Sequence, residues 1–210
     1  MSQYTEAEEY LKSSDKKLKA VIEKVGSCTL RVQRRNKFNV LASSIIGQQL
    51  SVKAANTIRG RVLELTSNNR TLQPDDFSMT TIKQLRSCGL SYAKSSSILE
   101  LSDNIISGKL NLNTINKLSD NEVINILASQ KGIGKWTAEM FMIFSLGRSN
   151  ILSVTDAGLL RSAQSIYNLQ NKPTPEVFKN IATKWNPYCS IASWYLWRHI
   201  DNKKPINKDP

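Results

Sequence analysis

The sequence predicts an all-α protein. Apolar residues recur at helical spacing along most of the 210-residue chain, and no segment alternates apolar and polar residues as a half-buried strand would. Glycines and capping residues interrupt this pattern at intervals, where one helix is expected to end and the next to begin. We therefore expect a set of short helices and no sheet.

In the N-terminal half, apolar stripes predict helices separated by short breaks. The first stripe, Leu18 to Val25, belongs to a helix that Gly26 can end. The next stripes consist of Phe38, Leu41, Ile45 and Ile46, then Val52, Ala55, Ile58, Val62 and Leu65, and then Ile98, Leu101 and Ile105. Breaks are expected at residues 47–49 and 89–92, because both segments begin with glycine.

The C-terminal half shows helix starts as well as stripes. Ser119 and Glu122 are spaced as a capping box that opens one helix. Leu159, Leu160, Ala163 and Tyr167 mark the helix that follows Asp156. Thr174 is a good N-cap with Pro175 at the first helical position, and residues 189–200 form an aromatic-rich last helix.

The composition favours a polyanionic partner. Lys and Arg (29) outnumber Asp and Glu (17), which gives a net charge of +12 and a pI near 9.7. The simplest such partner is nucleic acid, although a solvated basic surface would give the same charge. No apolar run is long enough to span a membrane, and the N-terminus is too polar for a signal peptide. We expect an intracellular protein, cytoplasmic in a prokaryote or nuclear in a eukaryote.

The cysteines argue against a disulfide framework. Cys28, Cys88 and Cys189 are odd in number and scattered, which suits a reducing compartment. No His/Cys spacing suggests zinc, so we expect no certain metal site.

A Gly-Ile-Gly turn at residues 132–134 lies between two helical stripes. Gly132 and Gly134 can take positive φ and expose backbone N–H groups, at the start of a helix whose dipole also favours an anion. Lys131 and Lys135 flank the turn. A phosphate would fit there without any reading of sequence, although a plain helix–helix turn would give the same pattern.

Three stretches in this order resemble one family. Residues 132–138 (GIGKWTA) resemble the hairpin of the helix-hairpin-helix DNA glycosylase superfamily. Residues 45–55 (IIGQQLSVKAA), together with residues 185–188 (WNPY) and 194–198 (WYLWR), resemble its 3-methyladenine DNA glycosylase II branch. The resemblance runs from about Phe38 to Arg198. One departure is Lys131, where the family usually has proline.

The resemblance implies two helical lobes. Residues 38–150 would form a six-helix barrel that carries the hairpin. Residues 1–37 and 151–210 would form the second lobe, and the active site would lie in a cleft between them. The three scattered cysteines exclude the four-cysteine iron–sulfur loop of the endonuclease III-like branch.

The resemblance also assigns candidate roles to single residues. Asp156 would be the catalytic carboxylate, although it is also placed to cap the helix that follows. The base pocket would contain Trp136, Trp197, Met140 and Tyr188, whereas Trp185 and Trp194 are expected in the core. The phosphate-binding hairpin would contain Lys131, Gly132, Ile133, Gly134, Lys135 and Thr137.

A wedge must fill the space that a flipped base leaves behind. Gln48, Gln49 and Leu50, in the first break, are the candidates, and Leu90, in the second break, would act from the opposite strand. The alternative is that both breaks are ordinary turns with their leucines in the core.

These features predict a monofunctional DNA glycosylase that acts as a monomer on damaged double-stranded DNA. Its substrates would be alkylated purines, 3-methyladenine first, with 7-methylguanine, ethenoadenine and hypoxanthine as further candidates. Relatives that also nick the backbone carry a Schiff-base lysine where this chain has Trp136, so no lyase activity is expected. The alternatives are a non-enzymatic binder of abasic or distorted DNA and a bifunctional glycosylase/lyase. No cofactor is expected beyond a Na⁺ or K⁺ ion that relatives can hold at the hairpin carbonyls.

Overall fold

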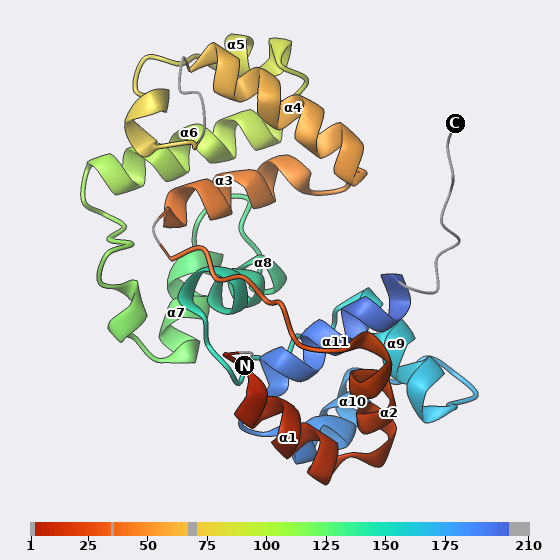
Figure 1. Ribbon diagram of the computed structural model, residues 1–210. Coiled ribbons are helices and arrows are strands. Elements are labelled where there is room, and N and C mark those ends of the chain that lie inside the picture. Colours follow the sequence, from red (N-terminus) through yellow and green to blue (C-terminus); the bar gives the residue numbers. More distant parts are fainter. Residues whose placement is uncertain (1–2, 35, 67–70, 202–210) are drawn as a thin grey trace. The chain divides into compact units, whose positions relative to one another are not determined.

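The computed structural model describes residues 3–34, 36–66 and 71–201, and the regular elements in this part of the chain are all helical. The all-α prediction is therefore confirmed. The helices divide into two compact units (Figure 1). Unit 1 comprises Met1–Arg31 and Gly147–Pro210, and unit 2 comprises Val32–Leu146. Among the described helices, none is both long and apolar enough to cross a bilayer.

Both boundaries between the two units fall a few residues before the expected positions 38 and 150. Hydrogen bonds explain the position of each boundary. Gln33 N donates to Phe144 O at 2.7 Å, and Ser145 Oγ donates to Gln33 O, so the segment before the first helix of unit 2 is bonded to its last turn. Ser190 N donates to Ser149 O at 2.8 Å, and Ile151 N donates to Ser190 Oγ at 2.9 Å. Residues 148–151 are thereby fastened to unit 1.

Unit 2 contains six α-helices within its described residues, the number that the family resemblance implies for the barrel lobe. They are α3 (Lys37–Gly47), α4 (Val52–Leu65), α5 (Ile82–Ser87), α6 (Tyr92–Ile106), α7 (Asp120–Ala128) and α8 (Lys135–Phe141). Two short 3₁₀ helices, η1 (Pro74–Phe77) and η2 (Ile115–Lys117), and a π-helical turn, η3 (Met142–Leu146), complete the unit. In Figure 1, α3 lies between α6 and α8, and it packs against both. Its Leu41, Ile45 and Ile46 are buried in the core of the unit.

Serine caps explain why the helices of unit 2 begin where they do. Ser51, Ser91 and Ser119 each accept a hydrogen bond from the backbone N–H three residues later, at the starts of α4, α6 and α7. Glu122 also reaches back to Ser119 N at 2.7 Å, which confirms the predicted capping box. The two breaks in unit 2 thus end in a residue that satisfies the first turn of the next helix.

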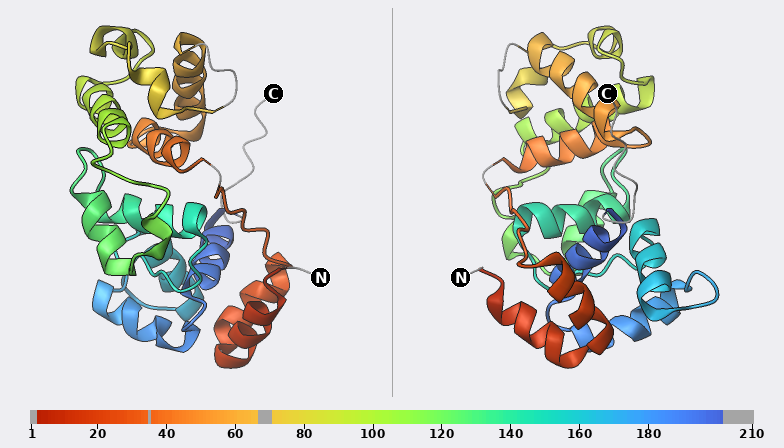
Figure 2. Two further views of the ribbon diagram at one scale, coloured as in Figure 1. Left: turned by 90° about the vertical axis from the view of Figure 1, so that its left-hand side faces the viewer. Right: turned by 45° about the vertical axis from the view of Figure 1, so that its right-hand side comes forward.

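Unit 1 is built around its last helix. Its elements are α1 (Thr5–Ser14), α2 (Lys16–Val25), α9 (Ala157–Tyr167), α10 (Pro175–Ala182), η4 (Thr183–Trp185) and α11 (Cys189–Asp201). Helix α11 packs against α2 and α9, as the views in Figures 1 and 2 show, and residues 189–196 are all buried. Trp185 (0% exposed) and Trp194 (6% exposed) lie in the core, as predicted.

The break between α1 and α2 depends on Asp15, which the sequence pattern did not single out. Its Oδ1 accepts from Lys17 N and Leu18 N, so the side chain caps α2. Its Oδ2 accepts from Trp185 Nε1 at 2.9 Å and from Tyr167 Oη. Asp15 is buried at 1% exposure, and these donors replace the water that burial removes.

Candidate active site

The two hairpin glycines between α7 and α8 differ in conformation. Gly132 has φ +77°, the left-handed conformation that the sequence predicts. Gly134 has φ −93° and ψ 173°, which is ordinary extended backbone, so it does not use the positive φ that is open to a glycine. A Cβ on Gly132 would lie 2.5 Å from Ser97 Oγ, whereas a Cβ on Gly134 would meet no heavy atom within 4 Å. Of the two hairpin glycines, Gly132 is therefore the one that the folded protein requires to be glycine.

The other hairpin residues divide into buried and exposed groups. Ile133 (3% exposed) and Thr137 (4% exposed) are buried, so their side chains anchor the hairpin and do not face a ligand. Lys131 Nζ donates to Ser96 Oγ at 2.9 Å and lies 3.7 Å from Glu100 Oε2, so the lysine that replaces the family's proline is directed towards α6. Lys135 has a side chain that is 66% exposed, with its Nζ 4.0 Å from Glu139 Oε1. Of the two lysines, Lys135 is the better placed to reach a phosphate.

The turn that carries the predicted wedge residues Gln48, Gln49 and Leu50, here called the wedge turn, lies against the hairpin. Gln48 Nε2 donates to Gly132 O at 2.9 Å. Gln49 is exposed and has φ +58°, and Leu50 is 38% exposed. Val52, which the apolar stripe placed on a buried face, is 78% exposed at the first position of α4. The turn therefore presents Gln49, Leu50 and Val52 to solvent.

A hollow of about 460 Å³ lies between this turn and α8. It is lined by Ser44, Gly47, Gln48, Gln49 and Trp136. Trp136 is 44% exposed, although aromatic side chains of this size usually bury most of their surface. The volume is within the range of about 300–1,000 Å³ that ligand pockets occupy. Met140, one helical turn after Trp136, is half-buried.

Leu90, the second predicted wedge, is a core residue. It is 4% exposed, and its N donates to Leu85 O across the α5–α6 turn. A side chain that enters a DNA stack must be exposed beforehand, so the alternative interpretation, an ordinary turn with its leucine in the core, holds for this break. Tyr92, two residues later, is 62% exposed instead.

In unit 1, Asp156 lies at the start of α9. Its Oδ1 accepts from Leu159 N at 2.7 Å, so the carboxylate caps the helix as the sequence suggested. The same oxygen accepts from Trp197 Nε1 at 3.2 Å. Asp156 is only 8% exposed, so two donors from different helices fix the position of one buried carboxylate. The structure thus brings together two of the predicted site residues from positions 41 apart in the sequence.

Gly158 leaves room for this contact, and sequence analysis missed it. A Cβ at position 158 would lie 3.1 Å from Asp156 Oδ1 and 3.4 Å from Trp197 Cδ1. Glycine is a poor helix former, about 1 kcal/mol less favourable than alanine in a helix interior, so a glycine within α9 calls for a reason. A glycine two residues after the candidate aspartate, in the first turn of the helix that this aspartate caps, was the available signal.

Tyr188 is placed elsewhere in unit 1. Its Oη donates to Glu6 Oε1 at 2.9 Å, and its ring packs edge-on against Tyr10 of α1. The predicted role of Tyr188 in the base pocket is not supported by these contacts.

Burial raises the pKa of the Cys28 and Cys189 thiols to about 11, so neither is a thiolate nucleophile at neutral pH.

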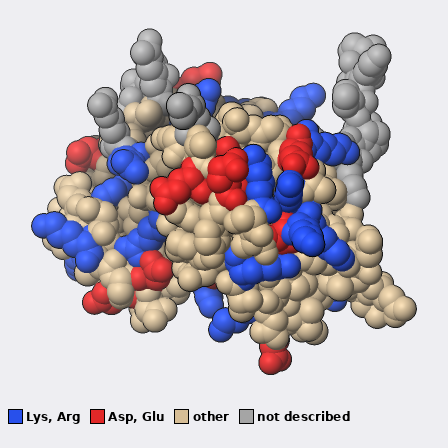
Figure 3. Space-filling view, turned by 60° about the horizontal axis from the view of Figure 1, so that its bottom comes forward, with Lys and Arg blue, Asp and Glu red and all other residues tan. Residues whose placement is uncertain are grey.

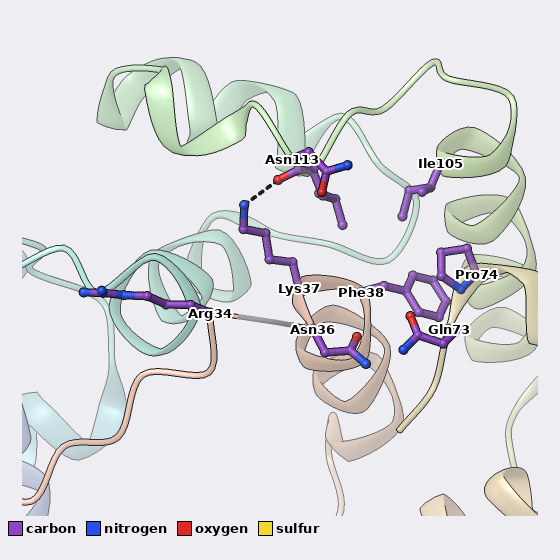
Figure 4. Close-up of a pocket in the computed structure, with 9 residues that line it drawn as sticks. Arg34, Asn36, Lys37, Phe38, Gln73, Pro74, Ile105 and Asn113 are labelled. Atoms are coloured by element: carbon purple, nitrogen blue, oxygen red, sulfur yellow. Dashed lines mark hydrogen bonds between the residues drawn. The ribbon is translucent and has the colours of Figure 1, made fainter. Parts of the chain in front are cut away.

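A second hollow of unit 2, of about 250 Å³, lies at the N-terminal end of α3, opposite to the wedge turn. Its basic side chains do not converge. Lys37 Nζ donates to Leu112 O at 2.7 Å, and Arg34 points away from the other residues drawn (Figure 4). Arg35, on the same segment, lies outside the described residues. This hollow offers no arrangement suited to an anion or a base.

Positive charge is not confined to the hairpin. Figure 3 shows Lys and Arg side chains in several patches, interleaved with acidic groups, on the face that lies at the bottom of Figure 1. Helix α2 alone contributes exposed Lys16, Lys17, Lys19 and Lys24. The net charge therefore provides a general attraction for a polyanion rather than a single anion site.

Comparison with known proteins identifies the family. Residues 42–187 match the HhH-GPD superfamily of base excision DNA repair proteins. The chain is 32% identical over 200 residues, 94% of each chain, to the alkylbase DNA glycosidase-like protein mag2 of Schizosaccharomyces pombe. The structure of a DNA-3-methyladenine glycosidase from Bacillus halodurans is similar, with a TM-score of 0.83, 35% identity, and coverage of 94% of this chain and 90% of that one.

A further similar structure is the 3-methyladenine DNA glycosylase Mag1 of Schizosaccharomyces pombe in complex with abasic DNA. It has a TM-score of 0.85 and 28% identity, over 94% of this chain and 97% of that one. The family match covers well over half of the sequence and spans the wedge turn, the hairpin and Asp156. The chain therefore belongs to the HhH-GPD superfamily of base excision DNA repair proteins.

Proposed function

We propose that this protein is a monofunctional DNA glycosylase that releases alkylated purines, with 3-methyladenine as the principal substrate. The observation that carries the proposal is the Asp156 carboxylate, buried and held by Leu159 N and Trp197 Nε1. The names of the relatives in yeast and Bacillus support the same substrate class.

The reaction begins with binding and base flipping. The hairpin, the wedge turn and Trp136 of unit 2 are the elements suited to hold the DNA backbone, to fill the vacated stack and to receive the base. An alkylated purine carries positive charge, which the face of an exposed indole attracts once water is removed. Trp136, which is 44% exposed and lines the 460 Å³ hollow, is therefore a candidate wall of the pocket.

Hydrolysis then breaks the bond between C1′ of the sugar and the base nitrogen. The bonding electron pair leaves with the base, which becomes neutral, while positive charge develops on the sugar. A fixed carboxylate stabilises this oxocarbenium-like state without reorganising, and it can accept a proton from the water that attacks C1′. Because a cationic base leaves readily, no general acid is required.

Trp136 supports a monofunctional reaction. A lyase needs an amine that attacks C1′ and forms a Schiff base, and the position where relatives carry that lysine is an indole in this chain. The neighbouring Lys135 points along another direction of α8, one residue further round the helix, and its Nζ lies 4.0 Å from Glu139.

The proposal includes duplex DNA as the partner and a monomer as the active species. It also includes a monovalent cation bound by carbonyl oxygens of the hairpin. Two of these oxygens accept hydrogen bonds within the protein: Gln130 O from Ile133 N, and Gly132 O from Gln48 Nε2. Comparing DNA affinity in Na⁺, K⁺ and tetramethylammonium buffers of equal ionic strength tests for the ion.

Incubation of the purified protein with methylated DNA tests the function. We expect release of free 3-methyladenine, abasic sites that break only in alkali, and no covalent adduct after borohydride treatment. Parallel substrates with 7-methylguanine, ethenoadenine or hypoxanthine measure the substrate range. A borohydride-trapped adduct would show a bifunctional enzyme. Tight binding to abasic DNA without any base release would show a non-enzymatic binder.

A further inference from the structure

Helix α6 contacts both loops that would bind DNA under the proposed function, the wedge turn and the hairpin. One polar stripe runs along it at helical spacing and consists of Lys94, Ser97, Glu100 and Asn104. Its N-terminal member contacts the wedge turn, and the other members contact the hairpin or its flank.

Lys94 fastens the wedge turn. Its Nζ donates to Ile46 O at 2.8 Å and to Gln48 O at 2.5 Å, so it caps the carbonyl end of α3. The last carbonyls of a helix have no partner within the helix, and a lysine can supply one. Burial of the amine lowers the pKa of Lys94.

Gln48 forms a second set of hydrogen bonds, which links the wedge turn to the hairpin. Its backbone carbonyl accepts from Lys94, and its side-chain amide donates to Gly132 O at 2.9 Å. The backbone carbonyl and the side-chain amide nitrogen of Gln48 are therefore both bonded within the protein. Gln49, in contrast, is exposed and lies in the left-handed region at φ +58°, a conformation that persists in a non-glycine residue only when its surroundings impose it.

The hairpin is tied to α6 as well. Lys131 Nζ donates to Ser96 Oγ, and Asn104 Nδ2 donates to Gln130 Oε1 at 2.9 Å. Gly132 packs so closely on Ser97 that a Cβ would overlap it. The hairpin and the wedge turn are thus fastened to the same helix and bonded to each other.

We propose that Lys94 and Gln48 are positioning residues that hold the wedge turn against the hairpin, so that Gln49, rather than Gln48, enters the DNA stack. This inference rests on the proposed function. A phosphate bound at the hairpin then fixes where Gln49 enters, and the ordering of the turn is complete before DNA binds, which is the advantage of preorganisation.

The test uses a duplex that contains an abasic site with 2-aminopurine as the opposite base. The fluorescence of 2-aminopurine reports insertion of a side chain beside it, without any chemistry, and anisotropy of a labelled strand reports affinity. Lys94→Met and Gln48→Met keep the length of each side chain and remove its donors. Gln49→Ala removes the proposed inserting group, and Lys83→Met, on α5, removes one exposed charge as a control.

We expect wild type and Lys83→Met to change the fluorescence equally. Gln49→Ala, Lys94→Met and Gln48→Met should each lose most of the change while affinity falls less, and Gln49→Ala with Lys94→Met should lose no more than either alone. In single-turnover base release, Lys94→Met should be slower by about tenfold on duplex DNA, as expected for loss of a charge-assisted hydrogen bond. Gln48→Met and Gln49→Ala should be slower on duplex DNA as well. On single strands, where no gap is filled, Lys94→Met should match wild type.

Several results would overturn the proposal. These are a full fluorescence change in Lys94→Met, an equal loss of rate on duplex and single strands, or loss of the signal in Gln48→Met that exceeds the loss in Gln49→Ala. If wild type releases no base but still changes the fluorescence, the proposed function fails while the positioning role stands.

Discussion

The two hairpin glycines provide a matched pair of mutations, because different constraints act on them. Gly132 combines φ +77° with a position where a Cβ would lie 2.5 Å from Ser97 Oγ and 2.8 Å from Ser97 Cβ. Gly134 has an extended backbone and open space around its Cα. The folded protein therefore requires glycine at 132, whereas at 134 only an approaching ligand would require it.

The expected changes in stability follow from these geometries. Gly132→Ala places alanine in the left-handed region, at about 1–2 kcal/mol, and overpacks it against Ser97, at about 1–3 kcal/mol. The sum of about 2–5 kcal/mol should lower Tm by roughly 4–20 °C in a chain of this size. Gly134→Ala should leave Tm unchanged or slightly raised, because alanine restricts the unfolded chain and fits the folded one.

DNA affinity should respond in the opposite way to stability. In Gly134→Ala, the added methyl group lies where a phosphate would approach the hairpin N–H groups, and loss of one such bond corresponds to about tenfold weaker binding. The loss should be the same for damaged and undamaged duplexes, because a phosphate contact reads no base. Fluorescence anisotropy at fixed salt, together with thermal melts, measures both quantities. Wild-type affinity in Gly134→Ala would refute the hairpin as a phosphate clamp, and wild-type Tm in Gly132→Ala would refute the packing argument.

Three further predictions concern the carboxylates and the charge. Gly158→Ala should displace Asp156 or Trp197 by a few tenths of an ångström. Base release should then be about tenfold slower at an unchanged Tm, since small misplacements of reacting groups slow a reaction strongly. An unchanged rate would show that the site accommodates the added methyl group without moving the carboxylate. The pKa of Asp15 is lowered in the folded protein, because hydrogen bonds from Tyr167, Trp185 and the backbone outweigh the opposing effect of burial. A lowered pKa stabilises the fold above the unfolded value of about 4, and this stability is lost as pH falls through the folded value. Thermal melts should therefore show Asp15→Asn less stable than wild type at pH 7, with the difference shrinking below about pH 4; a difference independent of pH would contradict this. DNA affinity should fall steeply with salt as counterions compete for phosphates, and a flat dependence would exclude the electrostatic account.

The sequence was sufficient for features that depend on neighbours in the chain. Apolar periodicity and caps such as Ser119 locate the helices, and the Gly132 turn follows from glycine's freedom at positive φ. Asp156 was recognisable as a helix cap for the same reason: its partner, Leu159 N, is three residues away. The match of motifs to one family then gave these local features a common chemistry.

Features that depend on distant segments were not predictable in the same way. Lys131 was expected to face phosphate, yet its partners are Ser96 and Glu100 on α6. Leu90 was offered as a wedge, but the packing of unit 2 buries it. The bond from Gln48 to Gly132 joins residues 84 apart, and neither periodicity nor spacing encodes it. These contacts decide which members of a motif face the ligand and which fasten the motif in place.

The central claim is that the Asp156 carboxylate drives loss of the base. The most direct measurement is the single-turnover release of 3-methyladenine from methylated DNA by wild type and by Asp156→Asn, with affinity for abasic DNA measured alongside. Asparagine can still cap α9 through its amide oxygen, so the fold should persist. The account predicts that the release rate falls by about a hundredfold or more while affinity is retained. Release at the wild-type rate by Asp156→Asn would contradict it.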